Sequence, residues 1–345
     1  MIRVLLAGIG NMGRSHALAY HAQPDFEIVG LVNRNPPSLP DELTNYDFYT
    51  DFDEALALTK PDLVCIATYS DSHAAYAIAA MKAGAHVFVE KPLATTVEDA
   101  IAVAKAAATY KRKLVVGYIL RHHPSWQQLI QEARALGGPY VFRLNLNQQS
   151  KGAEWATHKQ LMETTPPIVD CGVHYVDVMC QITDASPTQV RGMGLRLSAE
   201  INESMYNYGH FQVIFADGSV GWYEAGWGPM MSETAFFVKD VISPKGAVSI
   251  VAKDIAGSSD IDSHTKVGQL LVHPVDGDDR LVELADEPGH QALCEAEQAF
   301  VARAIKDDID LSRHALDAVQ SLAICLAADE SVRLGKAVDL KSLEL

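Results

Sequence analysis

Residues 4–13 read Val-Leu-Leu-Ala-Gly8-Ile-Gly10-Asn-Met-Gly13, and this stretch decides the fold of the first part of the chain. A short apolar strand runs into a Gly-x-Gly-x-x-Gly turn, and residues with helical spacing follow. Such glycines make a tight turn, let a pyrophosphate approach the backbone and allow close helix packing, while the helix N-terminus favours the anion. The alternative is a turn that binds no ligand. The predicted dinucleotide contacts here are Gly8, Gly10, Asn11, Met12 and Gly13.

The chain up to residue 122 repeats this pattern of strand and helix. Its apolar runs are continuous rather than alternating, which is typical of parallel strands covered on both faces. We therefore predict an α/β protein in which residues 1–122 form a Rossmann domain with a doubly wound parallel sheet. The predicted strands are 4–8, 27–32, 63–67, 86–89 and 114–117, and the predicted helices include 14–22, 72–84 and 97–111.

The pattern changes after Pro124, and residues 123–345 are predicted to form an α+β domain with a large, mostly antiparallel sheet. A helix to about residue 136 is followed by longer segments in which apolar and polar residues alternate, as in half-solvated strands. The helices near the C-terminus are expected to pack back towards the Rossmann domain. Predicted strands are 140–146, 190–197, 209–215, 220–225 and 235–241, with a hairpin turn at 216–219 and helices at 288–305 and 313–335.

The composition argues against two classes of partner. The formal net charge is −16, from 44 acidic and 28 basic residues, so nucleic acid and anionic membrane surfaces are not expected as partners. The sequence contains no apolar run of about 18 residues, and its beginning leads into the glycine turn rather than into a cleavage site. Five cysteines without a CxxC pair are expected to be reduced thiols. We expect a cytoplasmic protein.

The end of the second predicted strand bears on the choice of cofactor. It reads Asn33-Arg34-Asn35 and lacks the acidic residue that accepts hydrogen bonds from a free ribose 2′-hydroxyl. Asn33 can still bind the sugar, and Arg34 can pair with a 2′-phosphate. The segment therefore favours NADP over NAD, and the alternative is that Arg34 is a solvated loop charge.

Three further segments, in this order behind the glycine turn, resemble the family of glucose-fructose oxidoreductase, inositol dehydrogenase and the MocA-type dehydrogenases. They are 65–73, then 83–94 with Glu90-Lys91-Pro92, and 170–177 with Asp170-x-x-x-His174. The resemblance spans essentially the whole chain. It implies an NAD(P)-dependent oxidoreductase that transfers a hydride between nicotinamide and a sugar, inositol or related polyol, and a homo-oligomer, dimer or tetramer, built through the second domain's sheet.

The resemblance also implies roles for individual residues. Lys91 takes the family's catalytic acid/base position, and Asp170 and His174 take the positions of its Asp-x-x-x-His pair. One departure is Pro166-Pro167, where many relatives have a glycine-rich turn. This difference leaves the pair intact but affects the expected shape of the substrate pocket. The positions that we assign to the cofactor on this basis are Thr68, His73, Glu90 and Lys91.

The chemistry of alcohol oxidation suits these residue types. A base must take the hydroxyl proton while a nicotinamide takes the hydride, and Lys91 ends a predicted parallel strand, where ligands of open α/β sheets bind. The alternative is a surface lysine in a salt bridge. Asp170 and His174 are four residues apart, so on a helix they share one face, which Asp177 continues. The alternative for this pair is a helix-capping aspartate and a core histidine.

The predicted substrate-binding residues are Lys91, Arg121, Trp155, Asp170 and His174, with His122 and His158 as weaker candidates. No metal is predicted, because neither an HExxH motif nor a cysteine-rich ligand set accompanies Asp170, His174 and Asp177 or the pair His122 and His123. Two other functions stay open. One is a glycosidase of the same fold that uses bound NAD in an internal redox cycle, and the other is a non-catalytic dinucleotide-binding regulator.

Overall fold

The structure is a computed structural model of residues 1–345, and it describes all of them except 233–237, 252–267, 285–286 and 344. The chain divides into two compact units. Unit 1 contains residues 1–119, 288–319 and 345, and unit 2 contains residues 120–287 and 320–344. Residues 288–319, which lie in the predicted second domain, thus cluster with the first. Among the described residues, no helix is long and apolar enough to span a membrane.

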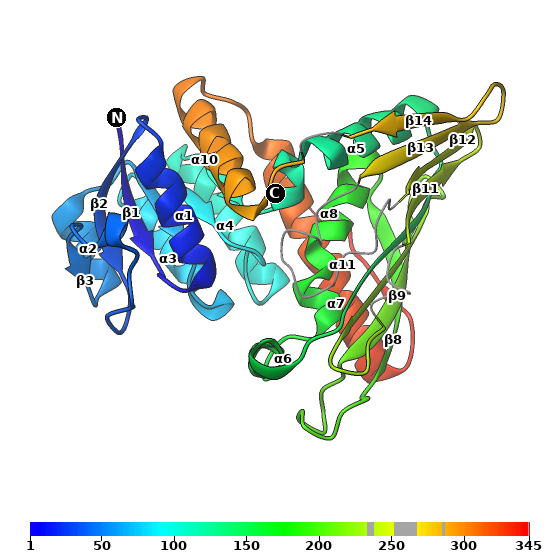
Figure 1. Ribbon diagram of the computed structural model, residues 1–345, viewed down its shortest axis with the longest axis horizontal. Helices are drawn as coiled ribbons and strands as arrows, with labels where there is room; N and C mark the ends of the chain where they lie inside the picture. The colour runs from blue at the N-terminus through cyan, green and yellow to red at the C-terminus, as the bar shows by residue number, and fades with distance from the viewer. Residues whose placement is uncertain (233–237, 252–267, 285–286, 344) are drawn as a thin grey trace. The chain divides into compact units, whose positions relative to one another are not determined.

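Unit 1 is built on a six-stranded parallel sheet in the order β3-β2-β1-β4-β5-β6. Figure 1 labels its strands β1, β2 and β3. The strand order reverses between β1 and β4, so this is the predicted doubly wound Rossmann sheet. The two-residue strand β3 was not predicted, because it is too short for a periodic pattern. The strands are β1 (Ile2–Ala7), β2 (Phe26–Val32), β3 (Phe48–Tyr49), β4 (Leu63–Ile66), β5 (His86–Val89) and β6 (Leu114–Val116).

The helices of unit 1 follow the strands, and two begin with a side-chain cap. Asp51 accepts a hydrogen bond from the Glu54 amide, and Thr96 accepts one from the Asp99 amide, which satisfies amides that lack a partner within the helix. These helices are α1 (Asn11–Ala22), α2 (Phe52–Thr59), α3 (Ser70–Lys82), α4 (Val97–Tyr110) and α10 (His290–Lys306), with the short 3-10 helix η1 (Asp41–Leu43).

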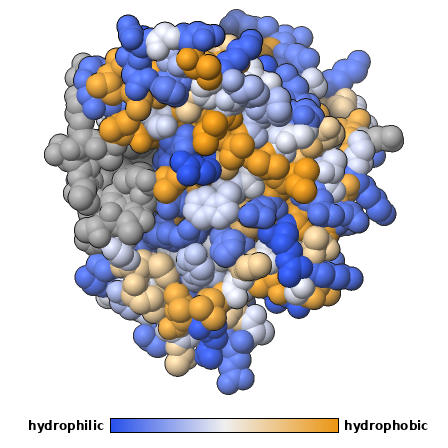
Figure 2. All heavy atoms as spheres, turned by 90° about the vertical axis from the view of Figure 1, so that its right-hand side faces the viewer, coloured by the Kyte–Doolittle hydropathy of each residue, from blue (hydrophilic) through white to orange (hydrophobic). Residues whose placement is uncertain are grey.

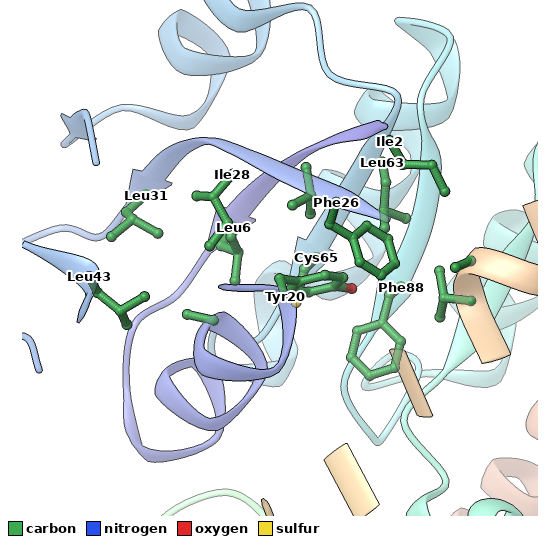
Figure 3. Packing of buried hydrophobic residues seen from close by; sticks show 14 of the residues in the cluster. Ile2, Leu6, Tyr20, Phe26, Ile28, Leu31, Leu43, Leu63, Cys65 and Phe88 are labelled. Carbon is green, nitrogen blue, oxygen red and sulfur yellow. The ribbon is translucent and has the colours of Figure 1, made fainter. Parts of the chain in front are cut away.

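A buried apolar cluster explains why α10 belongs to unit 1. Alternate residues of β1 pack with Tyr20 of α1 and Phe88 of β5, and Val301 and Ala302 of α10 complete the cluster. Figure 3 shows Tyr20, Cys65 and Phe88 close together beneath the sheet. Burying these side chains stabilises the unit at about 25 cal/mol per Å² of apolar surface removed from water. The N-terminal segment therefore depends on a helix from near the C-terminus for part of its core.

Unit 2 contains a nine-stranded sheet in the order β14-β13-β12-β11-β7-β10-β9-β8-β15. All neighbours are antiparallel except β7 and β10, which are parallel. The predicted strand 235–241 is observed only in part, since 235–237 lie outside the described residues. The strands are β7 (Val141–Gln148), β8 (Pro187–Leu195), β9 (Tyr208–Phe215), β10 (Val220–Trp227), β11 (Lys239–Ser243), β12 (Gly246–Ile250), β13 (Gln269–Pro274), β14 (Arg280–Glu283) and β15 (Val338–Asp339).

In the part of the chain that the structure describes, helices pack against one face of this sheet, and several apolar side chains of its strands are exposed. Phe142, Phe211 and Tyr223 are buried on the helix-covered face, whereas the neighbouring Ile214 and Val220 are exposed. Figure 2 shows the side that carries the strands at the right of Figure 1, where apolar side chains lie among polar ones. The helices are η2 (Ile119–His122), α5 (Pro124–Leu136), α6 (Gly152–Leu161), α7 (Pro167–Asp170), α8 (Gly172–Ile182) and α11 (Ser312–Leu334), and η2 and α11 each have residues in both units.

The predicted hairpin turn is confirmed, and a glycine ends α11. Residues 216–219 connect β9 to β10, and Gly218 has a φ of 86°, which glycine adopts without steric cost. Gly335 ends α11 with a φ of 64°, and its amide donates to the Ser331 carbonyl at 2.9 Å. All five cysteine side chains are buried.

Candidate functional site

The glycine turn joins β1 to α1 and is closed on its sheet side. Gly8 has a φ of 91°, and a Cβ atom there would lie 2.4 Å from the Ala67 carbonyl oxygen. A Cβ atom on Gly13 would lie 1.9 Å from the Gly8 carbonyl oxygen. At Gly10, by contrast, a Cβ atom would meet nothing within 4 Å, and the residue is exposed. The turn is therefore tightly packed at two glycines and open at the third.

The start of α1 presents backbone donors without a side-chain cap. Gly10 is the N-cap residue, no side chain caps the helix, and its first turn has no acidic residue. The Arg14 amide makes the first helical hydrogen bond, to the Gly10 carbonyl at 2.9 Å. The first-turn amides at Asn11, Met12 and Gly13, together with the helix dipole, suit a pyrophosphate group.

Asn33 follows β2 and holds the glycine turn in place. Its Oδ1 accepts a hydrogen bond from the Ile9 amide at 3.1 Å, and its Nδ2 donates to the Asn35 carbonyl at 2.7 Å. Asn33, predicted to bind the sugar, thus already uses both polar atoms within the protein. The adjacent Arg34 is exposed.

His73, in the first turn of α3, connects two loops at the same edge of the sheet. Its Nδ1 lies 2.8 Å from the Pro92 carbonyl oxygen and its Nε2 lies 3.1 Å from the Thr68 carbonyl oxygen. The side chain is 1% exposed. The Thr68 hydroxyl meets the Ser72 hydroxyl at 2.7 Å. These contacts fix the loop after β4 against the loop that carries Lys91.

Glu90 and Lys91 follow β5 directly. The Glu90 amide donates to the Ile66 carbonyl at 2.8 Å, which continues the parallel ladder. Its Oε1 lies 2.6 Å from Nε2 of the fully buried His16, and its Oε2 accepts the Lys91 amide at 3.0 Å. Burial raises the pKa of the Glu90 carboxyl, but the hydrogen bond from His16, together with the charge and the amide of Lys91, outweighs burial and lowers this pKa to about 2. Glu90 is therefore a charged carboxylate near neutral pH, and Lys91 is half-buried.

Asp170 and His174 lie on two consecutive short helices of unit 2. Asp170 is the last residue of α7 and His174 lies in the first turns of α8; Cys171 separates the two helices but keeps helical dihedral angles, with φ −83° and ψ −33°. Both side chains are half-buried. Pro166-Pro167 stands where many relatives have a glycine-rich turn. Pro167 occupies the first position of α7, where proline is favoured.

Asp177 lies at helical spacing from Asp170 and His174, but its carboxylate is not accessible to solvent. Its side chain is fully buried, and its two carboxylate oxygens accept Arg121 Nη2 at 2.6 Å and Nε at 2.8 Å. Gln181 Nε2 donates to the same carboxylate at 3.0 Å. Burial makes this bidentate pair necessary, because a lone carboxylate there is costly. Arg121, predicted to bind substrate, thus directs two of its nitrogens into the protein.

Two other predicted pocket residues, Trp155 and His158, lie on α6, and His122 ends η2. Trp155 is 6% exposed and donates from Nε1 to Glu200 at 3.3 Å. The His158 ring stacks on Trp227, with centroids 4.3 Å apart and planes 7° apart. His123 caps α5 through Nδ1, which accepts the Ser125 amide, and burial lowers the pKa of this imidazole. In the described part of the chain, no group of three or more His, Cys, Asp or Glu side chains is placed to hold a metal ion.

Two residues near Asp170 and His174 were missed by the sequence analysis. Gln148 ends β7, Trp227 ends β10, and the two are paired in register in the parallel part of the sheet. Gln148 Oε1 accepts Trp227 Nε1 at 2.7 Å and the Cys171 thiol at 3.8 Å. A polar residue at a strand end was the available signal, but the parallel pairing that brings the two ends together has no local pattern.

The structure thus groups the predicted residues into two sets. In unit 1, the glycine turn, Asn33, Thr68 and Lys91 lie at the carboxyl ends of β1, β2, β4 and β5, which is where open parallel sheets bind ligands. In unit 2, Asp170 and His174 flank Cys171, which contacts Gln148.

Comparisons with known proteins agree with this geometry. The chain is 31% identical over 169 residues to 4-carboxy-2-hydroxymuconate-6-semialdehyde dehydrogenase of Sphingobium sp., covering 46% of this chain and 54% of the relative. It is 27% identical over 191 residues to inositol 2-dehydrogenase/D-chiro-inositol 3-dehydrogenase of Halalkalibacterium halodurans, covering 53% of each. The chain thus spans about half the length of the curated relatives it matches.

A solved structure is similar over almost the whole chain. UDP-N-acetylglucosamine 3-dehydrogenase from Acidithiobacillus ferrooxidans has a TM-score of 0.77 at 22% identity, covering 96% of this chain and 98% of that one, which shows the shared fold. The model of an oxidoreductase family with an NAD-binding Rossmann fold matches residues 2–118, and the GFO/IDH/MocA C-terminal domain model matches residues 126–237. The chain therefore belongs to the GFO/IDH/MocA oxidoreductase family.

Proposed function

We propose that this protein is an NAD(P)-dependent oxidoreductase that transfers a hydride between nicotinamide and a hydroxyl or carbonyl carbon of a sugar, inositol or related polyol. The observation that carries the proposal is the position of Lys91. This residue follows the carboxyl end of β5, and the uncapped helix α1 follows the carboxyl end of β1 in the same parallel sheet. The names of the relatives, an inositol dehydrogenase and a UDP-N-acetylglucosamine dehydrogenase, support the substrate class. Residues 1–122 bind the dinucleotide, and the domain that follows binds the substrate.

The dinucleotide fits the unit 1 site, because the first-turn amides of α1 and the open side of Gly10 suit its pyrophosphate. The nicotinamide ring, when bound, supplies the acceptor or donor of the hydride. During oxidation the Lys91 amine takes the hydroxyl proton as the carbon loses its hydride, and a C=O bond forms; during reduction the ammonium returns that proton. Asp170 and His174 bind and orient the substrate's hydroxyl groups, and His174 holds or relays a proton.

The preferred cofactor in this proposal is NADP. The three residues that follow β2 are Asn33, Arg34 and Asn35, so no carboxylate stands there to accept the ribose 2′-hydroxyl. Asn33 is already held by Ile9 and Asn35, whereas Arg34 is exposed and available to a 2′-phosphate.

The test is an absorbance assay of nicotinamide reduction, with NAD and NADP in separate series, across inositols, aldoses, sugar acids and glycosides. We expect a reduced-cofactor signal with a polyol and a higher kcat/KM with NADP than with NAD. Glycoside cleavage without net cofactor change would indicate the redox glycosidase instead. Cofactor binding without turnover of any substrate in either direction would favour the regulator and contradict the proposal.

We also propose that the protein forms a homo-oligomer through the exposed face of its second sheet. Val141, Val220 and Ile214 are direct cross-strand neighbours on β7, β10 and β9 and are each about 40% exposed. An exposed apolar row on an open sheet is typical of an interface between copies.

Replacing Val220 with aspartate should lower the mass of the assembly, because a desolvated charge at an interface is costly. Light scattering after size-exclusion chromatography measures this. Leu58→Asp, at a 64% exposed apolar side chain of α2, is the matched control and should keep the parent mass. An unchanged mass in Val220→Asp would place the interface elsewhere.

A further inference from the structure

A chain of buried hydrogen bonds runs through unit 1 and ends at Lys91. The Tyr20 hydroxyl donates to Gln298 Oε1 at 2.5 Å, and Gln298 Nε2 lies 3.0 Å from His16 Nδ1. His16 Nε2 lies 2.6 Å from Glu90 Oε1, and the Lys91 amide donates to Glu90 Oε2 at 3.0 Å. Figure 3 shows Tyr20 in the apolar cluster beneath the sheet. The chain therefore extends from the core of unit 1 to the residue that we propose as acid/base.

The direction of these hydrogen bonds follows from the chemistry of the groups. An amide nitrogen can only donate, so Nδ1 of His16 accepts from Gln298 and the imidazole proton lies on Nε2. Nε2 then donates to Glu90, which accepts at both oxygens, from His16 and from the Lys91 amide. Gln298 thus selects the tautomer that supports the Glu90 carboxylate.

The other acidic groups that face Glu90 all have raised pKa values. Burial raises the pKa of the Cys65 thiol on β4, and the Glu90 charge raises it further. Burial likewise raises the pKa values of Cys294 and Glu297 on α10, again with a contribution from Glu90. Burial also raises the pKa of Tyr20. Within this group Glu90 therefore carries the negative charge, directly before Lys91.

A carboxylate is an expensive choice for a purely structural acceptor at this position. Glu90 is 7% exposed, and removing a charged carboxylate from water costs several kcal/mol unless it is paired and hydrogen-bonded. A glutamine of the same shape has a single acceptor oxygen, so it could accept from only one of the two donors, His16 Nε2 and the Lys91 amide. The carboxylate accepts from both donors and brings a negative charge to the residue directly before Lys91.

We propose that Glu90 is a positioning residue for Lys91, and that His16, Gln298 and Tyr20 hold it in place. One oxygen fixes the backbone of Lys91, and the negative charge favours the protonated form of the neighbouring amine, which sets the pH range in which Lys91 exchanges a proton with substrate. Gln298 lies on α10, so the C-terminal part of the chain completes a site on the Rossmann unit. This inference rests on the proposed function, in which Lys91 is the acid/base.

The test compares Glu90→Gln with the parent in the full-length protein. Removing the charge disfavours the ammonium form, so the acidic limb of the kcat/KM profile for alcohol oxidation should move to lower pH by about one unit. We also expect kcat to fall about tenfold or more while the dinucleotide Kd changes little, because the misplaced amine affects the chemical step. A residue with only a structural role would change stability without moving the pH profile.

A second measurement avoids cofactor and substrate altogether. Limited acetylation of the full-length chain at a series of pH values, read by mass spectrometry, gives the midpoint for deprotonation of the Lys91 amine. This midpoint should fall by about one pH unit in Glu90→Gln. Gln298→Met removes the donor to His16 but keeps a side chain of similar length, and it should move the Lys91 midpoint in the same direction. This second variant keeps the inference testable if Glu90→Gln does not fold.

Thr59→Val is the matched control, because it removes one buried hydrogen bond in unit 1, from the Thr59 hydroxyl to the Ala55 carbonyl, away from the chain. It should leave the Lys91 midpoint and the pH profile unchanged. If Glu90→Gln keeps the parent midpoint and profile while Lys91→Ala is inactive, the positioning role of Glu90 is overturned and the proposed function stands. If Lys91→Ala is active, the proposed function itself fails.

Discussion

Replacing Lys91 with alanine should abolish measurable turnover while leaving dinucleotide affinity nearly unchanged. The Lys91 amine is the proposed acceptor of the hydroxyl proton, and loss of a positioned acid/base typically lowers a rate about a hundredfold to ten-thousandfold. The contacts expected for the pyrophosphate come instead from the backbone of the glycine turn and α1, which alanine at 91 does not alter. Steady-state kcat and a calorimetric Kd for NADP measure the two effects separately.

The control for this variant is Lys82→Ala, which removes an exposed lysine from the last turn of α3 in the same unit. It should retain the parent kcat. Small primary amines added to Lys91→Ala should restore part of the activity in proportion to their basicity, because they can occupy the space of the missing amine. Full activity in Lys91→Ala would contradict the mechanism proposed for this site.

Alanine at Gly13 should remove both the stability of unit 1 and its dinucleotide binding, whereas alanine at Gly10 should affect binding alone. A Cβ atom on Gly13 would lie 1.9 Å from the Gly8 carbonyl oxygen, so the turn must shift, and we expect a loss of about 3 kcal/mol in the free energy of unfolding. At Gly10 a methyl group would project into open space, on the side from which we propose that the pyrophosphate approaches the helix.

Thermal unfolding with and without NADP, together with calorimetric binding, distinguishes these two variants. Gly10→Ala should keep the parent Tm without ligand but lose affinity by about tenfold or more, which corresponds to about 1.4 kcal/mol. Its Tm should therefore rise less on addition of the dinucleotide. Gly10→Ala with parent affinity would show that the dinucleotide does not approach the backbone at this turn.

The first half of the fold was predictable because its signals are local. Strands β1, β4 and β5 are short apolar runs, and each is followed by a segment with helical spacing, so this part of the strand and helix pattern could be inferred from neighbouring residues alone. The glycine turn is equally local, since the strand before it and the helix after it lie within twenty residues of sequence. The two-residue strand β3 was missed because pairing with β2, rather than its own pattern, defines it.

The roles of charged residues were less predictable than their positions. Asp177 follows Asp170 and His174 at helical spacing, but the structure buries it in a bidentate pair with Arg121, 56 residues earlier in the chain. Spacing along one helix indicates which residues share a face, whereas the neighbouring elements decide whether a carboxylate on that helix meets solvent or an arginine.

The sequence by itself determined the Rossmann architecture and the glycine turn, because each depends on residues adjacent in the chain. It also placed Lys91 in a Glu-Lys-Pro segment after the fourth predicted strand, residues 86–89. Only the tertiary structure placed Gln298 against His16, across 282 residues, and paired β7 with β10 in parallel, which joins Gln148 to Trp227. Such contacts depend on which surfaces bury each other when the chain folds, and no local period encodes that choice. The glycine turn could thus be identified from local sequence, whereas the buried hydrogen bonds that hold Glu90 beside Lys91 were decided by the packing of α10 against α1.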